Sequence, residues 1–141
     1  MRMSKRVLSF VMFAVLLFIT AISTFAKTDN GITPYYNNAS ATSEVFSIDE
    51  NGLATVSFTC RGIRGTTTKI VVDTKIEKQN GSSWVEVDNA SWTDQSTLYI
   101  CSNEHEIQLT ERGTYKATVT YTVSGSGGTD DVITREIQKT Y

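Results

Sequence analysis

Apolar and polar residues alternate along most of this chain with a period of two, which is the pattern of a half-buried β-strand. The segments 54–60 and 115–123 show it most clearly. In the second of these segments, Tyr115, Ala117, Val119, Tyr121 and Val123 alternate with one lysine and three threonines. Threonine is β-branched and suits the outer face of such a strand. Both segments are therefore predicted to be strands with one buried face.

Shorter or less regular patterns predict the other strands and the turns between them. The remaining strands are expected at residues 44–48, 68–78, 84–87, 96–101 and 132–139, with 105–109 as a further inward-facing set. Asn-Gly and Gly-rich pairs between them are typical of turns. No amphipathic helix of useful length is found. About seven strands at spacings near ten residues predict an all-β protein, folded as a single antiparallel β-sandwich.

The first 26 residues have the organisation of a secretory signal peptide. Arg2, Lys5 and Arg6 precede an uncharged apolar run of 13 residues that ends at Ile19, and Ala26 closes a small-residue cleavage site. The run is shorter than the ~20 residues that a transmembrane helix needs. We therefore expect cleavage after Ala26 and a secreted, extracellular product without a stable membrane anchor. A retained membrane anchor is the alternative.

The rest of the chain divides into an arm and one domain. Residues 27–43 are polar and turn-rich and are predicted to form an extended N-terminal arm, whereas residues 44–141 should form the sandwich. Without the leader, ten basic residues remain against 15 acidic ones, a net charge of about −5. This balance argues against general nucleic-acid binding and against docking on an anionic membrane.

The start of the segment 115–123 resembles the corner that enters the sixth strand of immunoglobulin-like (Ig-like) sandwiches. Leu109, Gly113, Tyr115 and Ala117 carry this resemblance. It implies that Tyr115 is a structural corner residue, buried, with its hydroxyl bonded to the backbone near 110–112. Ala117 stands where that family has a cysteine, so the usual bridge between the sheets is absent. The resemblance implies an Ig-like architecture rather than membership of the antibody superfamily.

The whole segment after the leader also resembles an uncharacterised family of small secreted Gram-positive bacterial proteins. The features that carry this likeness are Pro34-Tyr35-Tyr36-Asn37-Asn38, Gly52-Leu53-Ala54-Thr55, Ile76-Glu77-Lys78, Gly81 with Trp84, and Gly113-Thr114-Tyr115. The resemblance implies a bacterial, secreted protein with an Ig-like β-sandwich domain. It implies no particular mechanism.

The two cysteines, Cys60 and Cys101, are predicted to form one disulfide. Their number is even, and an exported protein meets an oxidising compartment. Cys60 follows the inward-facing positions of its strand, whereas the facing of Cys101 is ambiguous in the pattern. Two separate, buried and reduced thiols are the alternative.

No catalytic or metal-binding set emerges from the titratable residues. His105 is the only histidine, and its neighbours Glu104 and Glu106 must point to the opposite face of a strand. The acidic turn at 49–52 and the pair Asp130-Asp131 leave calcium binding open, although neither has the full spacing of a calcium loop. We therefore predict a protein that is not an enzyme and uses no cofactor.

A non-catalytic binding or interaction module is the leading hypothesis, with an extracellular protein or glycan as its partner. The predicted binding tip is the Gly-rich hairpin end formed by Ser124, Gly125, Ser126, Gly127, Gly128, Thr129, Asp130 and Asp131. Loops on rigid sandwiches commonly carry binding function. A small secreted hydrolase that uses a carboxylate pair, through Asp131 or Glu106, is one alternative. A passive envelope or matrix protein with self-pairing edge strands is the other.

Overall fold

The computed structural model describes residues 35–141, so the predicted leader and residues 27–34 of the predicted arm lie outside the described part. The unit 34–141 is compact, and its seven strands are β1 (Ala39–Ile48), β2 (Leu53–Gly62), β3 (Thr67–Asn80), β4 (Ser83–Ser96), β5 (Ile100–Gln108), β6 (Thr114–Gly125) and β7 (Asp131–Thr140). Within these residues no helix is long and apolar enough to cross a membrane.

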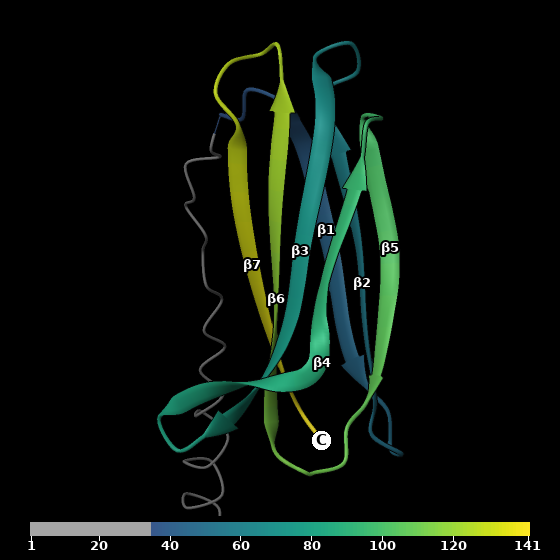
Figure 1. Cartoon of the computed structure of the whole chain (residues 1–141), viewed down its shortest axis with the longest axis vertical. Helices are drawn as coiled ribbons and strands as arrows, with labels where there is room; N and C mark the ends of the chain where they lie inside the picture. The colour runs from purple at the N-terminus through teal and green to yellow at the C-terminus, as the bar shows by residue number, and fades with distance from the viewer. Residues whose placement is uncertain (1–34) are drawn as a thin grey trace, which may run out of the picture. The chain divides into compact units, whose positions relative to one another are not determined.

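The strands form two antiparallel sheets that lie face to face, as Figure 1 shows. One sheet has the order β1-β2-β5 and the other the order β4-β3-β6-β7. The second strand thus pairs with the fifth and the third with the sixth, which is the pairing of Ig-like sandwiches. The predicted all-β, antiparallel, Ig-like sandwich of about seven strands is confirmed.

The core lies between the sheets and is built from the inward-facing positions of the alternating segments. In β2 and β6 nearly every second residue is buried. The largest fully buried side chains include Tyr115, Tyr121, Phe46, Ile70, Ile76, Val56 and Val72. The edge of the Tyr121 ring packs against Phe58 from the other sheet, with ring centroids 6.2 Å apart. The alternation in the sequence therefore predicts the buried face correctly.

Three strand boundaries differ from the predicted ones. β1 begins at Ala39, five residues before the predicted start at Glu44. β4 runs unbroken over the polar stretch that was expected to follow a short strand at 84–87, with one irregularity at Asn89, whose φ is 59°. The predicted strand 96–101 is wrong, because β4 ends at Ser96 and β5 begins at Ile100. Leu98 gave this stretch a strand-like pattern, but its side chain is 68 % exposed in a turn.

The register of β3 and β4 shifts between Lys75 and Glu77, opposite the Asn89 irregularity. Beyond that point the two strands continue as a hairpin that curls away from the sandwich in Figure 1. Trp84, near the end of this hairpin, lies under the Lys116 ammonium at 4.8 Å. The hairpin is therefore tied to the outer face of the four-stranded sheet.

Candidate functional site

The predicted binding tip, residues 124–131, is bound to the start of the described chain. The buried carboxylate of Asp131 accepts hydrogen bonds from the backbone N–H groups of Asn37 (3.0 Å), Asn38 (2.6 Å) and Ala39 (2.8 Å). Burial alone would raise the pKa of Asp131, but the three donors outweigh it and the pKa lies below its ordinary value. This contact also explains why β1 begins as early as Ala39.

The remaining tip residues complete the same attachment. The backbone N–H of Gly127 donates to the Asn38 side-chain oxygen (3.0 Å), and the Thr129 carbonyl accepts from the Asn38 amide (3.0 Å). A Cβ placed on Gly127 would lie 2.0 Å from the Asn37 carbonyl oxygen. Glycine is thus needed here for close backbone approach. We call residues 35–39 and 124–131 the anchored loops.

The two adjacent carboxylates of the tip serve different purposes. Asp131 is 7 % exposed and its two oxygens are occupied by backbone donors, whereas Asp130 is exposed. In the acidic turn at 49–52, one Asp49 oxygen accepts the N–H groups of Asn51 and Leu53, as in an Asx-turn. No group of three potential metal-ligating side chains occurs among residues 35–141. The described acidic turns therefore act as structural caps.

The two cysteines are cross-strand neighbours near one end of the three-stranded sheet. Cys60 of β2 is paired in register with Cys101 of β5, and both side chains are buried. They are free thiols in the structure, so the predicted disulfide is not formed there. Burial and the neighbouring Cys101 raise the pKa of Cys60 to about 12. Burial, with a smaller contribution from Asp94, also raises the pKa of Cys101.

The predicted tyrosine corner is present at the start of β6. Tyr115 is 2 % exposed, and its hydroxyl donates to the Glu111 carbonyl oxygen at 2.6 Å. Glu111 lies within the stretch 110–112 that the resemblance to Ig-like corners indicates. The corner therefore fixes the loop between β5 and β6, at the end of the sandwich away from the anchored loops.

His105 closes one of the two seams where an edge strand of one sheet meets an edge strand of the other. Its Nε2 atom lies 2.5 Å from an Asp94 oxygen of β4, and its ring stacks on Trp92 with 4.8 Å between centroids. Asn103 donates to the other Asp94 oxygen at 2.6 Å. Glu104 and Glu106 point to the opposite face, as expected. The only histidine is therefore committed to a contact between the sheets.

The other seam, between β1 and β7, is closed by different groups. The Tyr121 hydroxyl donates to one Glu44 oxygen at 3.0 Å, and the Arg135 guanidinium lies 3.6 Å from the other. Burial and the nearby Glu44 raise the pKa of Tyr121 far above its ordinary value. Both seams thus hold a carboxylate bound to groups from the opposite sheet.

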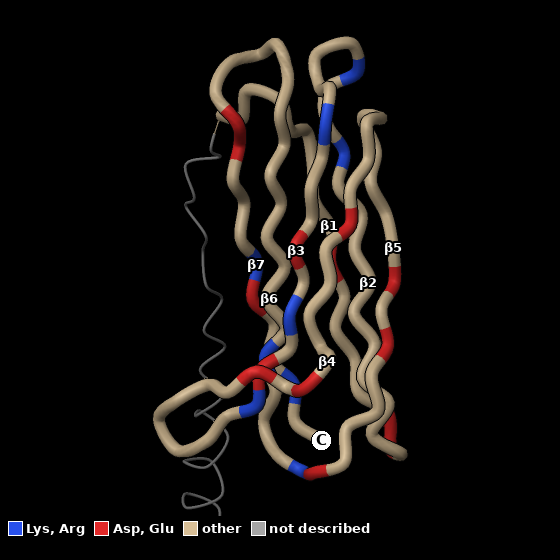
Figure 2. The backbone as a smooth tube through the Cα atoms, in the orientation of Figure 1, with Lys and Arg blue, Asp and Glu red and all other residues tan. Residues whose placement is uncertain are grey.

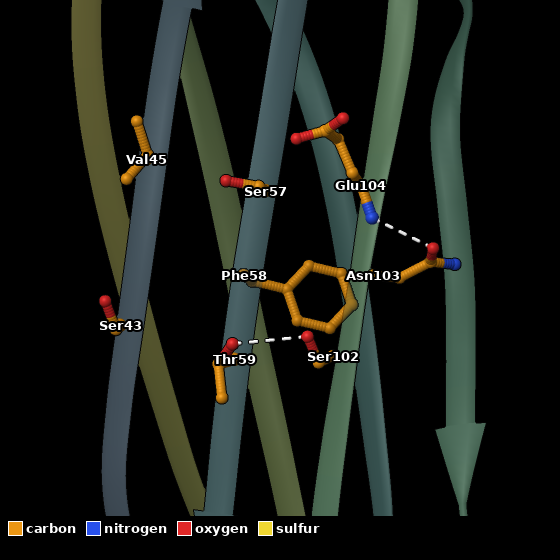
Figure 3. Close-up of a pocket in the computed structure, with 8 residues that line it drawn as sticks. All are labelled: Ser43, Val45, Ser57, Phe58, Thr59, Ser102, Asn103 and Glu104. Carbon is orange, nitrogen blue, oxygen red and sulfur yellow. Dashed lines mark hydrogen bonds between the residues drawn. The ribbon is translucent and has the colours of Figure 1, made fainter.

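A shallow groove of about 390 Å³ lies on the outer face of the three-stranded sheet (Figure 3). The strand register sets outward side chains in two cross-strand rows, Ser43–Thr59–Ser102 and Val45–Ser57–Glu104. In the first row, Thr59 donates to the Ser102 hydroxyl at 3.2 Å. The centre of the groove is shallow because its side chains are short, and Glu104 stands at one margin.

A second exposed region lies at the same end of the sandwich as the anchored loops. It is formed by the β2–β3 connection and the turn between β4 and β5, which meet where the Gly62 N–H donates to the Tyr99 carbonyl (2.8 Å). Arg64 also donates to the Tyr99 hydroxyl (2.6 Å) and lies over its ring. Figure 2 shows basic segments along this connection and the start of β3. We call residues 61–69 and 97–99 the basic loops.

Comparisons with protein-family models, with curated proteins and with solved structures gave no match. The assignment of a site therefore depends on the geometry of the molecule itself. Of the sites predicted from the sequence, the Tyr115 corner and the inward facing of Cys60 are present, and the structure shows that Cys101, whose facing the pattern left open, is also buried. The groove and the basic loops were not foreseen, since each depends on which strands and loops become neighbours.

Proposed function

We propose that this protein is a secreted, non-catalytic binding module, related to small exported proteins of Gram-positive bacteria, that contacts a glycan or a protein outside the cell. The groove on the β1-β2-β5 face is the single observation that carries the proposal. Its volume falls within the range of small-ligand sites. We favour the groove over the predicted tip 124–131, because Asp131 of the tip is engaged by the backbone of Asn37–Ala39, although residues 126–130 remain exposed.

The chemistry of the groove favours a glycan over an apolar peptide. Its two rows present hydroxyl groups and one carboxylate, which can donate to and accept from sugar hydroxyls. Val45, 58 % exposed, adds one apolar contact on the β1 side. A surface of this kind stays hydrated when empty and binds weakly through several hydrogen bonds.

A glycan array probed with residues 27–141 tests this proposal. Ser57, at the centre of the groove, is replaced by Gln in the variant, which fills the space above the short side chains. Thr122→Gln on the outer face of the other sheet is the matched control, since it makes the same change far from the groove. Binding that Ser57→Gln abolishes and Thr122→Gln leaves intact supports the proposal. Equal binding by both variants, or none by the parent protein, contradicts it.

The hydrolase alternative has one remaining carboxylate pair, Glu104 and Glu106. They lie two residues apart on the outer side of β5, where side chains are separated by about 7 Å. That spacing is compatible with inverting glycosidases, but both side chains are exposed and unpaired with any described cation. Turnover of a glycoside panel that Glu106→Gln abolishes would establish this alternative and refute the non-catalytic assignment.

We also propose that Cys60 and Cys101 are joined in the exported protein. Hydrogen-bonded and non-hydrogen-bonded pairs alternate along β2 and β5, and the Gly62–Tyr99 hydrogen bond places the cysteine pair among the hydrogen-bonded ones. Cα atoms in such pairs are about 5.5 Å apart, a separation that disulfides require. The bridge would close a ring of 42 residues and stabilise the domain by roughly 4 kcal/mol.

The raised pKa values of both thiols indicate when this bond has to form. A buried thiol that stays protonated reacts slowly, because the thiolate is the nucleophile. We therefore expect oxidation before the sheets close, and slow oxidation of folded, reduced protein. The intact mass of the secreted protein, and alkylation of its cysteines after denaturation, show whether Cys60 and Cys101 are joined. Two thiols that alkylate without prior reduction would exclude the bridge.

A further inference from the structure

We propose that the basic loops form a second interaction surface, which docks on an anionic phospholipid bilayer. Three cationic side chains, those of Arg61, Arg64 and Lys69, are exposed there, and none makes an ion pair with another described residue. Two apolar side chains, Leu98 (68 % exposed) and Ile63 (38 %), stand beside them. Ile63, Arg64 and Leu98 do not line the groove, and Arg61 lies one cross-strand row beyond Ser43–Thr59–Ser102 on the same face.

The hydrogen bonds bring the tips of the two loops together, and Arg61 and Lys69 flank these tips on the outer faces of the three-stranded and the four-stranded sheet. Gly62 and Arg64 of the β2–β3 connection both bond to Tyr99, which follows Leu98 in the opposing turn. The 390 Å³ groove lies on the outer face of a sheet, whereas this surface lies at the loop end of the sandwich. Lys69 lines a shallow pocket with Gln95, Ser96 and Thr97 on the outer side of the four-stranded sheet. Long Arg and Lys side chains on both sides of the apolar tips can extend toward an anionic surface at this end.

The combination of charge and apolar tips favours a bilayer over other anionic partners. Cations near an anionic bilayer are attracted to its surface potential, while apolar tips and tyrosine rings bury in the interfacial region. A soluble anionic polymer would use the cations but gain little from Leu98 and Ile63. The net charge of about −5 after the leader opposes docking only on average, because the basic loops contain Arg61, Arg64 and Lys69 and no acidic residue.

The neighbouring anchored loops set the orientation of the docked molecule. Asp130 is exposed on the β6–β7 loop at the same end of the sandwich, so an anionic bilayer repels that side. Asp131 adds no such exposed charge, because it is buried under three backbone donors. The β2–β3 side is therefore the one that faces the bilayer, which leaves the three-stranded face free.

Sedimentation with lipid vesicles tests the proposal, with residues 27–141 so that the apolar leader cannot contribute. One set of vesicles contains phosphatidylcholine alone and the other an equimolar mixture with phosphatidylglycerol. We expect association with the anionic set only, weakened by added salt. The variant Arg61→Glu/Arg64→Glu/Lys69→Glu should reduce the partition coefficient at least about a hundredfold. Ile63→Ser/Leu98→Ser should reduce it about tenfold.

Val132→Ser/Lys139→Glu is the matched control, because it makes the same kinds of change on exposed positions of β7 and should leave association unchanged. No association of the parent protein with anionic vesicles at low salt overturns the proposal. Association that depends on charge but not on Ile63 and Leu98 also overturns it, because the apolar tips then do not enter the bilayer. Self-association without lipid that the charge reversal abolishes overturns it in favour of a second copy of the chain. Ser57→Gln should not change vesicle binding, so this result is independent of the groove.

Discussion

The anchored loops and the basic loops lie at the same end of the sandwich, but they are built for different purposes. In the anchored loops, one buried carboxylate, two asparagine side chains and closely packed glycines fix the chain start against the β6–β7 hairpin. In the basic loops, apolar and cationic side chains extend outward, and Gly65 has no atom within 4 Å of an added Cβ. The Gly-rich segment 124–131 has the composition of a flexible loop, but hydrogen bonds and close packing hold it in place.

The difference shows that a glycine-rich composition does not by itself indicate mobility. Gly125, Gly127 and Gly128 occupy positions where a side chain would touch the Asn37–Asn38 segment or Thr66. Asp131 lies more than 90 residues from its donors in sequence. A local pattern contains no information about such a partner. The comparison predicts large stability effects in the anchored loops and small ones at the exposed tips of the basic loops, because the inner part of residues 61–69 is itself bonded to Asn38 and Ser126.

The largest effect is expected for Asp131→Ala. Removing the carboxylate leaves the N–H groups of Asn37, Asn38 and Ala39 without their acceptor in a buried site, which should lower the free energy of unfolding by roughly 3 kcal/mol. Urea denaturation measures it. Asp130→Ala, next to it but exposed, is the control and should change stability by less than about 0.5 kcal/mol. Similar losses in the two variants would contradict the anchoring role of Asp131.

Gly127→Ala should cost about 2–3 kcal/mol, because the new Cβ would meet a backbone carbonyl that cannot move without disturbing β1. Gly65→Ala in the basic loops is the matched variant. It meets no atom, but Gly65 has a φ of 82°, so a cost of about 1 kcal/mol is expected from backbone strain alone. The urea midpoints of the two variants show which substitution lowers stability more. A larger loss for Gly65→Ala than for Gly127→Ala would refute the comparison.

Tyr115→Phe should cost about 1.5 kcal/mol, since it leaves the Glu111 carbonyl without its donor. The corner lies at the opposite end of the sandwich, so the loss should add to that of Asp131→Ala in the double variant. Chemical denaturation of the single and double variants measures both quantities. A denaturation midpoint unchanged by Tyr115→Phe would show that the Tyr115 hydrogen bond does not stabilise the domain.

Acid should loosen the anchored loops before the basic loops. The pKa of Asp131 is below its ordinary value of 3.8, so its contribution is complete above that value and is lost as the pH falls through the lower, folded-state pKa. Asp131→Asn should therefore show a weaker loss of stability between neutral pH and strong acid than the parent protein. Thermal unfolding across that range tests it, and parallel curves would contradict the assigned cause.

The smallest effect is expected for Leu98→Ser. The side chain is 68 % exposed and contributes little to the core, so stability should change by less than about 0.5 kcal/mol. Thermal unfolding provides the measurement. A large loss would mean that Leu98 packs against the domain, and the basic loops would no longer qualify as a free surface.

The sequence predicts those features that depend on local alternation. It does not predict features that depend on which distant segments become neighbours in the fold. The buried faces of β2 and β6 and the Tyr115 corner follow from residues within a few positions of each other. The pairing of Cys60 with Cys101 was expected from their number alone, and the register now places them opposite each other. The extent of β4 was missed because residues 88–96 are mostly polar, and only Ala90 and Trp92 are apolar at their inward positions. The groove and the His105–Asp94 contact require the strand order, which alternation does not give.

The attachment of Asn37–Ala39 to Asp131 also determines how the chain can fold. The first strand gains its anchor only when the last strand is available, with more than 90 residues between the two. Contacts of such long sequence separation make folding slow, because the chain loses loop entropy before it gains the contact. A partly synthesised chain that ends before residue 131 lacks this contact and β7 altogether. The sandwich can therefore close completely only after β7 has been synthesised.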